Sequence, residues 1–248
     1  MDEAFARTAL LLGREGIERL QRARVAVFGI GGVGGYAAEA LARSGVGHLD
    51  LVDSDRVSPT NLNRQIIALR STIGRPKTEI MAERIRGICP ETRVTVHNCF
   101  YLPETAGAFD FTLYDYVVDA VDTVAAKLTL ILESRRCRTP VISAMGAGNH
   151  LDPTRLRVSD LSETVNCPLA RIMRKELRRR GVEHLRVAWT DEEALVPDLS
   201  AVDSAETPAP GRRTVPGSAI FVPAAMGLAM ASEVVRNIAF DRTEEAIP

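Results

Sequence analysis

The sequence has 248 residues, 46% of them hydrophobic, and a formal net charge of -1. This length predicts a single domain, residues 1–248, with one α/β core and some elaborations. The near-neutral charge excludes a protein that coats nucleic acid or an anionic membrane through its overall field, and it leaves only local patches for such contacts.

The first part of the chain alternates β-branched runs with helical periodicity. We predict an N-terminal helical arm over 1–23 and a nucleotide-binding core over 24–148. Strands are expected in the core at 24–28, 49–53, 93–97, 116–120 and 140–143, with helices between them. Strand, helix and strand in series indicate an α/β fold, a Rossmann-like and mostly parallel sheet with helices on both faces.

The pattern changes after Gly148, and we predict a substrate-side elaboration over 149–248. Its expected elements are a strand near 155–158, a helix over 168–180, a strand near 185–189 and a terminal strand and helix over 218–239. Residues 190–217 contain four prolines and no apolar periodicity, which is typical of a long loop.

The cysteines and the apolar runs bear on the cellular compartment. The four cysteines form no C-x-x-C pair, so neither a zinc clamp nor a redox couple is expected. We expect no signal peptide at the N-terminus, and the apolar run over 219–231 is too short to cross a bilayer. We therefore expect a cytoplasmic protein with no membrane partner.

A glycine-rich turn lies between the first strand and the following helix, in the run VAVFGIGGVGG. Gly29, Gly31, Gly32 and Gly34 fit the G-x-G-x-x-G frame, and Asp53 ends the next strand. Such a turn brings backbone N–H groups and a helix N-terminus to a phosphate, while the aspartate can accept hydrogen bonds from a ribose. Taken alone, the turn favours NAD or a flavin dinucleotide, and a glycine turn without a ligand is the alternative.

The segment after Asp53 favours a triphosphate instead, because it adds amides and cations that a dehydrogenase does not need. Its polar residues, together with the lysine of GRPK, are Asp55, Asn61, Asn63, Arg64, Gln65 and Lys77. They supply the donors that neutralise a triphosphate. Asp122 follows a strand at the ligand-facing edge of the predicted sheet and is a natural Mg²⁺ ligand.

Each of these residues also has an ordinary structural explanation. Arg64 could pair with Asp55 on the surface, Lys77 could be a solvated helix residue, and Asp122 could cap the helix that begins near Thr123. Their occurrence together and in this order favours a nucleotide site.

With these motifs the sequence resembles the ubiquitin-activating-enzyme-like superfamily of adenylating enzymes. The resemblance rests on GIGGVG, the D-x-D of Asp53 and Asp55, NLNRQ, GRPK and the DAVD that ends at Asp122. It implies that ATP is contacted by Gly32, Asp53, Asn61, Arg64 and Lys77, with Asp122 near Mg²⁺ and the phosphates. Such enzymes activate a carboxylate as an acyl adenylate and release pyrophosphate, and the cations stabilise charge that develops on the α-phosphate.

Within this superfamily the sequence is most similar to the tRNA threonylcarbamoyladenosine dehydratase family. The similarity lies in TNLNRQIIALRSTIGRPK, RIRGICPETRVTV, GAGNHLDPTRLRVSDLSET and CPLARIMRKELRRRGV. It implies ATP-dependent cyclisation of threonylcarbamoyladenosine in tRNA, with a ring closure inside the substrate that expels AMP. A nucleophile in the same side chain has a high effective molarity, so no separate acyl acceptor is needed. The loop over 143–149 is the candidate site for the modified nucleoside.

The superfamily resemblance also implies a homodimer in which an N-terminal arginine reaches the phosphates of the neighbouring subunit. Arg7 in ARTALLLG is the candidate, and a plain surface arginine is the alternative. A sulfur-relay protein partner is left open. Cys167 could be a thioester nucleophile or an ordinary thiol. The ordinary thiol is favoured, because no histidine lies near Cys167 in the sequence.

The helix that begins at Pro168 carries a local basic patch. At helical spacing, Leu169, Ile172, Met173 and Leu177 fall on one side, and the candidate tRNA-binding residues Arg171, Arg174, Lys175 and Arg178 fall on the other. This stripe suits tRNA phosphates, and a solvated helix face is the alternative.

The predicted function is therefore that of an ATP- and Mg²⁺-dependent, tRNA-modifying cyclase. An adenylyltransferase that activates a ubiquitin-like sulfur carrier would share the ATP site, although the zinc-binding cysteine pairs common in that branch are missing. An NAD-dependent oxidoreductase would share only the glycine turn and Asp53.

Overall fold

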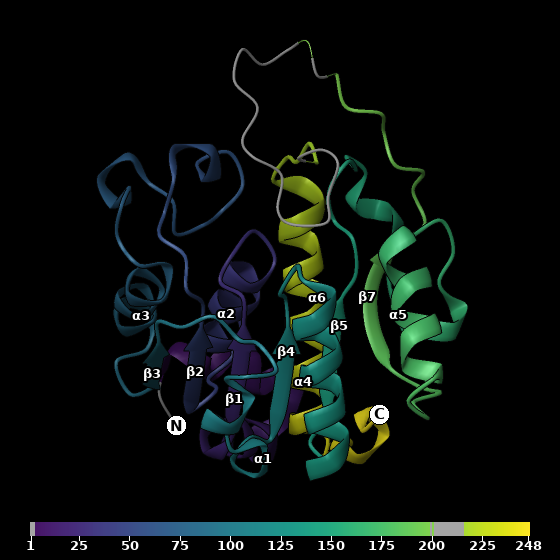
Figure 1. The fold of residues 1–248 in the computed structure, drawn as a ribbon. Helices are drawn as coiled ribbons and strands as arrows, with labels where there is room; N and C mark the ends of the chain where they lie inside the picture. Colours follow the sequence, from purple (N-terminus) through teal and green to yellow (C-terminus); the bar gives the residue numbers. More distant parts are fainter. Residues whose placement is uncertain (1–2, 199, 201–215) are drawn as a thin grey trace.

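A single mixed sheet lies at the centre of the computed structural model, which describes residues 3–198, 200 and 216–248 (Figure 1). Within this part of the chain the strand order is β3-β2-β1-β4-β5-β7-β6. Neighbouring strands are parallel except for β6 and β7, which are antiparallel. The strands are β1 (Arg24–Phe28), β2 (His48–Val52), β3 (Arg93–His97), β4 (Tyr116–Asp119), β5 (Val141–Ala144), β6 (Leu156–Asp160) and β7 (Arg186–Thr190).

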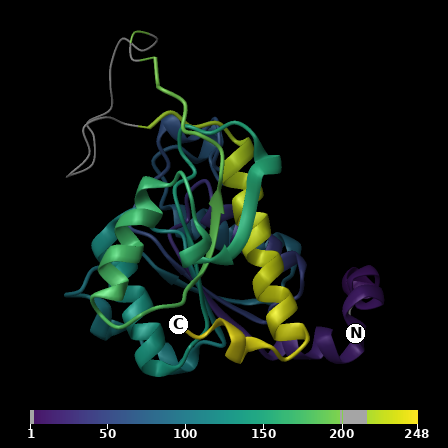
Figure 2. The same ribbon diagram turned by 90° about the vertical axis from the view of Figure 1, so that its right-hand side faces the viewer.

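Helices cover both faces of the sheet, as the sequence predicts (Figures 1 and 2). Side chains alternate along β1, so that Val25 and Val27 face one core and Ala26 and Phe28 face the other. The first core includes residues of α1 (Ala6–Arg22), α2 (Gly34–Arg43), α3 (Lys77–Ile88) and α6 (Phe221–Ala239). The second includes residues of α4 (Val124–Cys137) and α5 (Pro168–Arg178). In the described part of the chain, no helix is both long enough and apolar enough to span a membrane.

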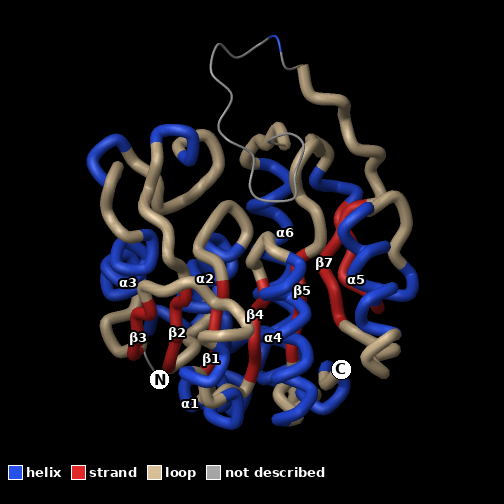
Figure 3. The backbone as a smooth tube through the Cα atoms, in the orientation of Figure 1, coloured by secondary structure: helices blue, strands red, loops and turns tan. Residues whose placement is uncertain are grey.

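The carboxyl ends of the central strands meet at one edge of the sheet. Because β1 pairs in parallel with β2 and with β4, the loops after these three strands are neighbours. Figure 3 shows the loops gathered at this edge, above the strands. An open parallel sheet binds its ligands in the crevice at this position.

The part after Gly148 continues the same sheet. The strands predicted near 155–158 and 185–189 are β6 and β7, and β7 pairs with β5. The terminal strand predicted before α6 is wrong, because residues 216–220 form no strand. This segment bonds to two loops instead, since Asn149 donates to the Gly217 carbonyl and Asn63 donates to the Ser218 carbonyl. Residues 199 and 201–215 of the predicted loop lie outside the described residues.

The N-terminal arm starts at the opposite edge of the sheet. Phe5 is buried, and its ring lies 3.3 Å from the position of a Cβ on Gly45, just before β2 begins. Helix α1 is kinked at Gly13, whose φ is 73°, and its first part stands away from the sheet (Figure 2). Arg7 is exposed in that part. The structure therefore does not bring Arg7 to the carboxyl-end loops of its own chain.

One carboxylate is buried in the middle of β2. Asp50 accepts hydrogen bonds from the Arg24 guanidinium at 2.8 and 2.9 Å and lies 3.1 Å from His97 Nε2. Burial alone would raise the pKa of Asp50, but the hydrogen bonds from His97 and Arg24 outweigh it and hold that pKa below its ordinary value. This cluster is part of the core and contains none of the predicted site residues.

Candidate active site

Two of the four glycines set the shape of the turn after β1. Gly29 has a φ of 90°, and a Cβ there would lie 2.6 Å from the Ala120 carbonyl oxygen. A Cβ on Gly34, the first residue of α2, would lie 1.8 Å from the Gly29 carbonyl oxygen. Only glycine fits at either position.

Gly31 has a different environment, because the space above it is open. The atom nearest to the position of its Cβ is Gln65 Nε2, at 3.9 Å. A ligand can therefore approach the Gly31 backbone closely. The turn leads directly into the N-terminus of α2, where the Gly35 and Ala37 N–H groups donate to the Gly31 and Val33 carbonyl oxygens and the helix dipole favours an anion. This arrangement suits a phosphate.

Asp53 connects the end of β2 to the glycine turn. Its Oδ2 accepts a hydrogen bond from the Ile30 backbone N–H at 2.6 Å, and its Oδ1 accepts one from the Asp55 N–H at 2.8 Å. Burial raises the pKa of the Asp53 carboxyl, and the nearby Lys77 charge opposes that rise. Asp53 therefore holds the turn in place from the next strand.

Lys77 is the first residue of α3, and its side chain is only 6% exposed. Its Nζ lies 2.8 Å from Asp55 Oδ2, and its backbone N–H donates to the Asp55 carbonyl oxygen at 3.0 Å. Lys77 is therefore not a solvated helix residue. Asp55 pairs with Lys77 and not with Arg64, and its own side chain is 61% exposed.

Arg64 lies against the glycine turn. Its Cγ is 3.5 Å from the position of a Cβ on Gly32, and its guanidinium donates to the Thr60 carbonyl oxygen and to Asn63 Oδ1. Asn61 is buried, and its Oδ1 accepts a hydrogen bond from the Ser58 N–H, so this oxygen fixes the local turn.

Gln65 is 6% exposed and holds an unpaired acceptor. Its Oε1 has no hydrogen-bond partner, although its Nε2 lies beside Gly31. Buried polar atoms are rarely left unpaired, so this oxygen indicates that a ligand donor or a water binds beside the turn.

Asp122 is exposed and lies in the loop between β4 and α4. The N-cap residue of α4 is Thr123, which directly follows Asp122. The described residues contain no group of three or more histidine, cysteine or acidic side chains placed to hold a metal ion. A single carboxylate is enough for Mg²⁺, which commonly binds one or two carboxylates together with substrate phosphates and water.

The loop predicted to hold the nucleoside, residues 143–149, lies near the start of α6. The Asn149 N–H donates to the Gly217 carbonyl oxygen at 2.7 Å, and the Asn63 side chain donates to the Ser218 carbonyl oxygen at 2.7 Å. The segment 216–218 thus lies between the loop after β5 and the loop that carries Arg64.

Cys167 lies near the same loop and has a structural role. Its Sγ accepts the Ala170 N–H at 3.4 Å as the N-cap of α5, and it lies 3.7 Å from the position of a Cβ on Gly146. The interpretation of Cys167 as an ordinary thiol stays a prediction.

The structure corrects part of the basic stripe on α5. Arg171, Lys175 and Arg178 are exposed as expected. Arg174 is only partly exposed, and its guanidinium donates to the Thr164 carbonyl oxygen at 2.9 Å and to Thr164 Oγ1 at 2.6 Å. Its placement with the solvent-facing cations is therefore wrong. Ile172, expected on the packed side, is 46% exposed, because the helix buries only the narrow strip of Ala170, Met173 and Leu177.

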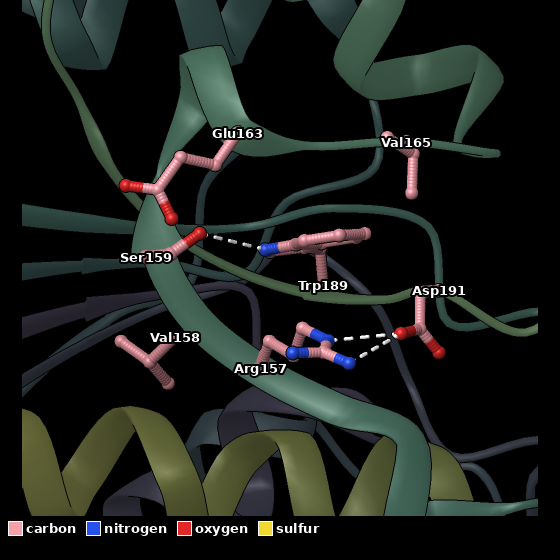
Figure 4. A pocket seen from close by; sticks show the side chains of 7 residues that line it. All are labelled: Arg157, Val158, Ser159, Glu163, Val165, Trp189 and Asp191. Atoms are coloured by element: carbon pink, nitrogen blue, oxygen red, sulfur yellow. Dashed lines mark hydrogen bonds and ion pairs between the residues drawn. The ribbon is translucent and has the colours of Figure 1, made fainter.

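A pocket of about 630 Å³ lies beside the edge strand β6 (Figure 4). Strands β4, β5 and β7 separate β6 from β1 and its glycine turn. Four of the lining side chains pair with one another. Trp189 Nε1 donates to Ser159 Oγ at 3.0 Å, and Arg157 forms an ion pair with Asp191. No predicted site residue lines this pocket.

Sequence reasoning missed a buried polar cluster below the loops. Asp119 at the end of β4, Lys127 in α4 and Ser143 in β5 are each no more than 1% exposed. Lys127 Nζ donates to both Asp119 oxygens at 3.1 and 3.2 Å and to Ser143 Oγ at 3.3 Å, and Ser143 Oγ donates to Asp119 Oδ2 at 2.6 Å. The sequence did contain an indication of the two charged members: Asp119 interrupts the apolar run YVVDAV, and Lys127 interrupts the apolar run AAKLTLIL.

Comparisons with known proteins agree with this geometry. The ThiF family model matches residues 5–247. The chain is similar to the tRNA threonylcarbamoyladenosine dehydratase of Bacillus subtilis, with 44% identity over 242 residues, covering 96% of this chain and 95% of the relative. It is also similar to two structures of Escherichia coli tRNA N6-threonylcarbamoyladenosine dehydratase, each covering 96% of this chain and 95% of the other. The complex with ATP has a TM-score of 0.84 at 37% identity, and the complex with AMP a TM-score of 0.85 at 36% identity.

Proposed function

Because the chain belongs to the ThiF family, we propose that it cyclises threonylcarbamoyladenosine in tRNA and uses ATP to activate the side-chain carboxylate. The observation that carries this proposal is the match, over nearly the full length of both chains, to a relative named for this activity. The ATP- and AMP-bound neighbours support adenylate chemistry on this fold. The NAD-dependent oxidoreductase and the sulfur-carrier adenylyltransferase are therefore set aside.

The reaction has two steps. The carboxylate of the substrate attacks the α-phosphorus of ATP, the bond to the β-phosphate oxygen breaks, and pyrophosphate leaves. A nucleophilic atom of the same side chain then attacks the activated carbonyl, AMP leaves, and the ring closes. The nucleoside loses one water in total. The carboxylate is already ionised at neutral pH, so the first step needs no general base.

The glycine turn and the cations around it form the proposed ATP site. The open backbone at Gly31 faces the phosphates, with Gly32 beside it under Arg64. Asp53 binds the ribose, and the unpaired Gln65 oxygen accepts from the nucleotide or an ordered water. The cations Arg64 and Lys77 stabilise the charge that develops on the α-phosphate. The other proposed contacts or supports of this site are Gly29, Gly34, Asp55, Asn61 and Asn63.

Asp122 is the proposed protein ligand of Mg²⁺. Its position in the loop after β4 places a carboxylate at the carboxyl edge of the sheet, beside the strand that carries the glycine turn. When bound, Mg²⁺ neutralises phosphate charge. Asp122→Asn should weaken Mg²⁺-dependent ATP binding while leaving the melting temperature near the wild-type value.

A homodimer with Arg7 acting in trans is the proposed assembly. The kinked first part of α1 carries Leu10 and Leu11 exposed at 85% and 81%, and it starts at the edge opposite the ATP site. Arg7 can therefore serve a neighbouring subunit but not its own. Mixing inactive Arg7→Ala with inactive Lys77→Ala should restore part of the activity in hybrid dimers. Absence of rescue despite proven subunit exchange would contradict the role of Arg7.

The tRNA is proposed to bind along α5 and to place its modified nucleoside at the loop over 143–149. Arg171, Lys175 and Arg178 present exposed charge to the phosphates. Because the substrate is tRNA, we place the enzyme in the cytoplasm. A sulfur-relay protein partner stays a prediction.

Exchange of pyrophosphate into ATP tests the proposed substrate. The exchange should be stimulated by tRNA that carries threonylcarbamoyladenosine, and neither by unmodified tRNA nor by a small sulfur-carrier protein that ends in Gly-Gly. Stimulation by the carrier protein alone would return the chain to the adenylyltransferase alternative. NADH fluorescence in the presence of the protein should not change.

A further inference from the structure

The cluster of Asp119, Lys127 and Ser143 connects three elements that end or begin at the active site. Asp119 is the last residue of β4, Ser143 lies one residue before the end of β5, and Lys127 lies in the first turn of α4. The Lys127 N–H also donates to the Thr123 carbonyl oxygen at 3.1 Å, just past Asp122. One buried network therefore fixes both strand ends and the start of the helix.

The network continues into the loop that carries Asp122. Asp119 Oδ1 accepts the Val121 backbone N–H at 3.2 Å, which turns the chain directly after β4. The intervening Ala120 donates to the Phe28 carbonyl oxygen at 2.8 Å, and its own carbonyl oxygen lies against Gly29. A shift of the end of β4 would therefore move Asp122 and press on the glycine turn.

The same network fixes the start of the candidate nucleoside loop. Ser143 Oγ is held by Asp119 and Lys127 together, and the loop over 143–149 continues from that residue. The ATP side and the nucleoside side of the site thus depend on one set of hydrogen bonds.

Stability alone is a weak reason to bury such a network. Desolvation of an ion pair in a core often cancels its attraction, and apolar replacements are often at least as stable. A fully connected polar network does fix one geometry, because any shift leaves a buried charge unpaired.

We propose that Asp119, Lys127 and Ser143 are positioning residues for the adenylation reaction: their buried network holds the loop of Asp122 and the nucleoside loop in register with the glycine turn. This inference rests on the proposed function. All three side chains are no more than 1% exposed, so they act through the two loops and not by contact with the substrate. A misplacement of about 1 Å at reacting atoms lowers a rate by roughly 100-fold.

Ser143→Ala is the test variant, because it removes one hydroxyl and keeps the ion pair. Ser143→Thr restores a hydroxyl. The matched control is Ser134→Ala, since Ser134 is a fully buried serine near the other end of α4 whose Oγ has no partner. Each variant is assayed for thermal stability, ATP affinity, cyclisation kinetics and backbone hydrogen exchange.

We expect Ser143→Ala to lower kcat by about 10- to 100-fold with KM for tRNA and Kd for ATP within about twofold of wild type. Its melting temperature should fall further than that of Ser134→Ala, because Ser143 loses a hydrogen bond to a buried carboxylate and Ser134 loses none, and the protein should stay folded at the assay temperature. Amides over 120–123 and 144–148 should exchange about tenfold faster in Ser143→Ala, unlike those of β1. Ser143→Thr should recover most of kcat.

The readouts separate this inference from the proposed function. Unchanged exchange in both loops of Ser143→Ala, or an unchanged kcat when the wild type cyclises tRNA, overturns the positioning role. Loss of kcat in Ser134→Ala to the same extent also overturns it. Faster exchange in both loops with no cyclisation by the wild-type protein would reject the proposed function while the structural link between the loops stands.

Discussion

Replacing Lys77 with alanine should separate catalysis from stability. The Nζ of Lys77 lies 2.8 Å from Asp55 Oδ2, but Asp55 is 61% exposed and returns to water when the lysine is removed. Removing the Lys77 charge also lets the pKa of Asp53 rise further, but the Asp53 carboxylate keeps its hydrogen bonds from the Ile30 and Asp55 N–H groups. An ion pair with one exposed partner contributes about 1 kcal/mol or less to stability. In a chain of this size, that corresponds to a fall of no more than about 4 °C in melting temperature.

The expected loss of activity is much larger. A positioned donor that acts on developing charge in the transition state is worth roughly 100- to 1,000-fold in kcat. Cyclisation is measured by nucleoside mass spectrometry and folding by thermal unfolding. The control is Arg75→Ala, which removes a neighbouring exposed ion pair with Glu83 and should keep full activity. Activity of Lys77→Ala within about fivefold of wild type, with ATP affinity unchanged, would refute the phosphate assignment.

Three further predictions follow from single contacts. Gly29→Ala should destabilise the protein by about 1–3 kcal/mol or more, because Gly29 has a positive φ and a Cβ there would collide with the Ala120 carbonyl oxygen. Gly31→Ala should fold normally, because the space around Gly31 is open, and it should weaken ATP binding. Thermal unfolding and ATP titration decide this, and unaltered ATP affinity in Gly31→Ala would count against an open phosphate site. Reversing Arg171 and Arg178 to glutamate should reduce the salt slope of tRNA binding by about two units without changing ATP affinity, and an unchanged slope would leave α5 a solvated face. The pKa of Asp50 is lower in the folded protein than its ordinary value of 3.8. At pH values above 3.8 the ionised Asp50 therefore stabilises the fold, and this stabilisation is lost as the pH falls through the pKa of the folded state. In Asp50→Asn the free energy of unfolding, measured with denaturant, should therefore depend less on pH between pH 5 and the acid transition. A pH profile identical to that of the wild type would contradict this.

The parts of the site that depend on local spacing were predictable from the sequence. The strand, glycine turn and helix around Gly29 follow from a short pattern, and so does the position of Asp53 after β2. The fold class followed from the alternation of strands and helices. These features need only residues close in the chain and the general geometry of a parallel sheet.

Features that depend on tertiary contacts were not predictable. The helical spacing of α5 placed Arg174 with the solvent-facing cations. A helical wheel describes one helix alone, so it cannot include Thr164, which lies outside α5 and accepts hydrogen bonds from the Arg174 guanidinium. The cluster of Asp119, Lys127 and Ser143 joins three elements. Its charged members were visible in apolar runs, but only the strand order shows that they meet.

The most direct test of the central claim uses the purified protein, ATP, Mg²⁺ and tRNA that carries threonylcarbamoyladenosine. The tRNA is digested and its nucleosides are measured by mass spectrometry, while AMP and pyrophosphate are quantified. We predict that the modified nucleoside loses the mass of one water, with one AMP and one pyrophosphate formed per nucleoside converted. An unchanged nucleoside mass at full ATP occupancy would contradict the proposed function.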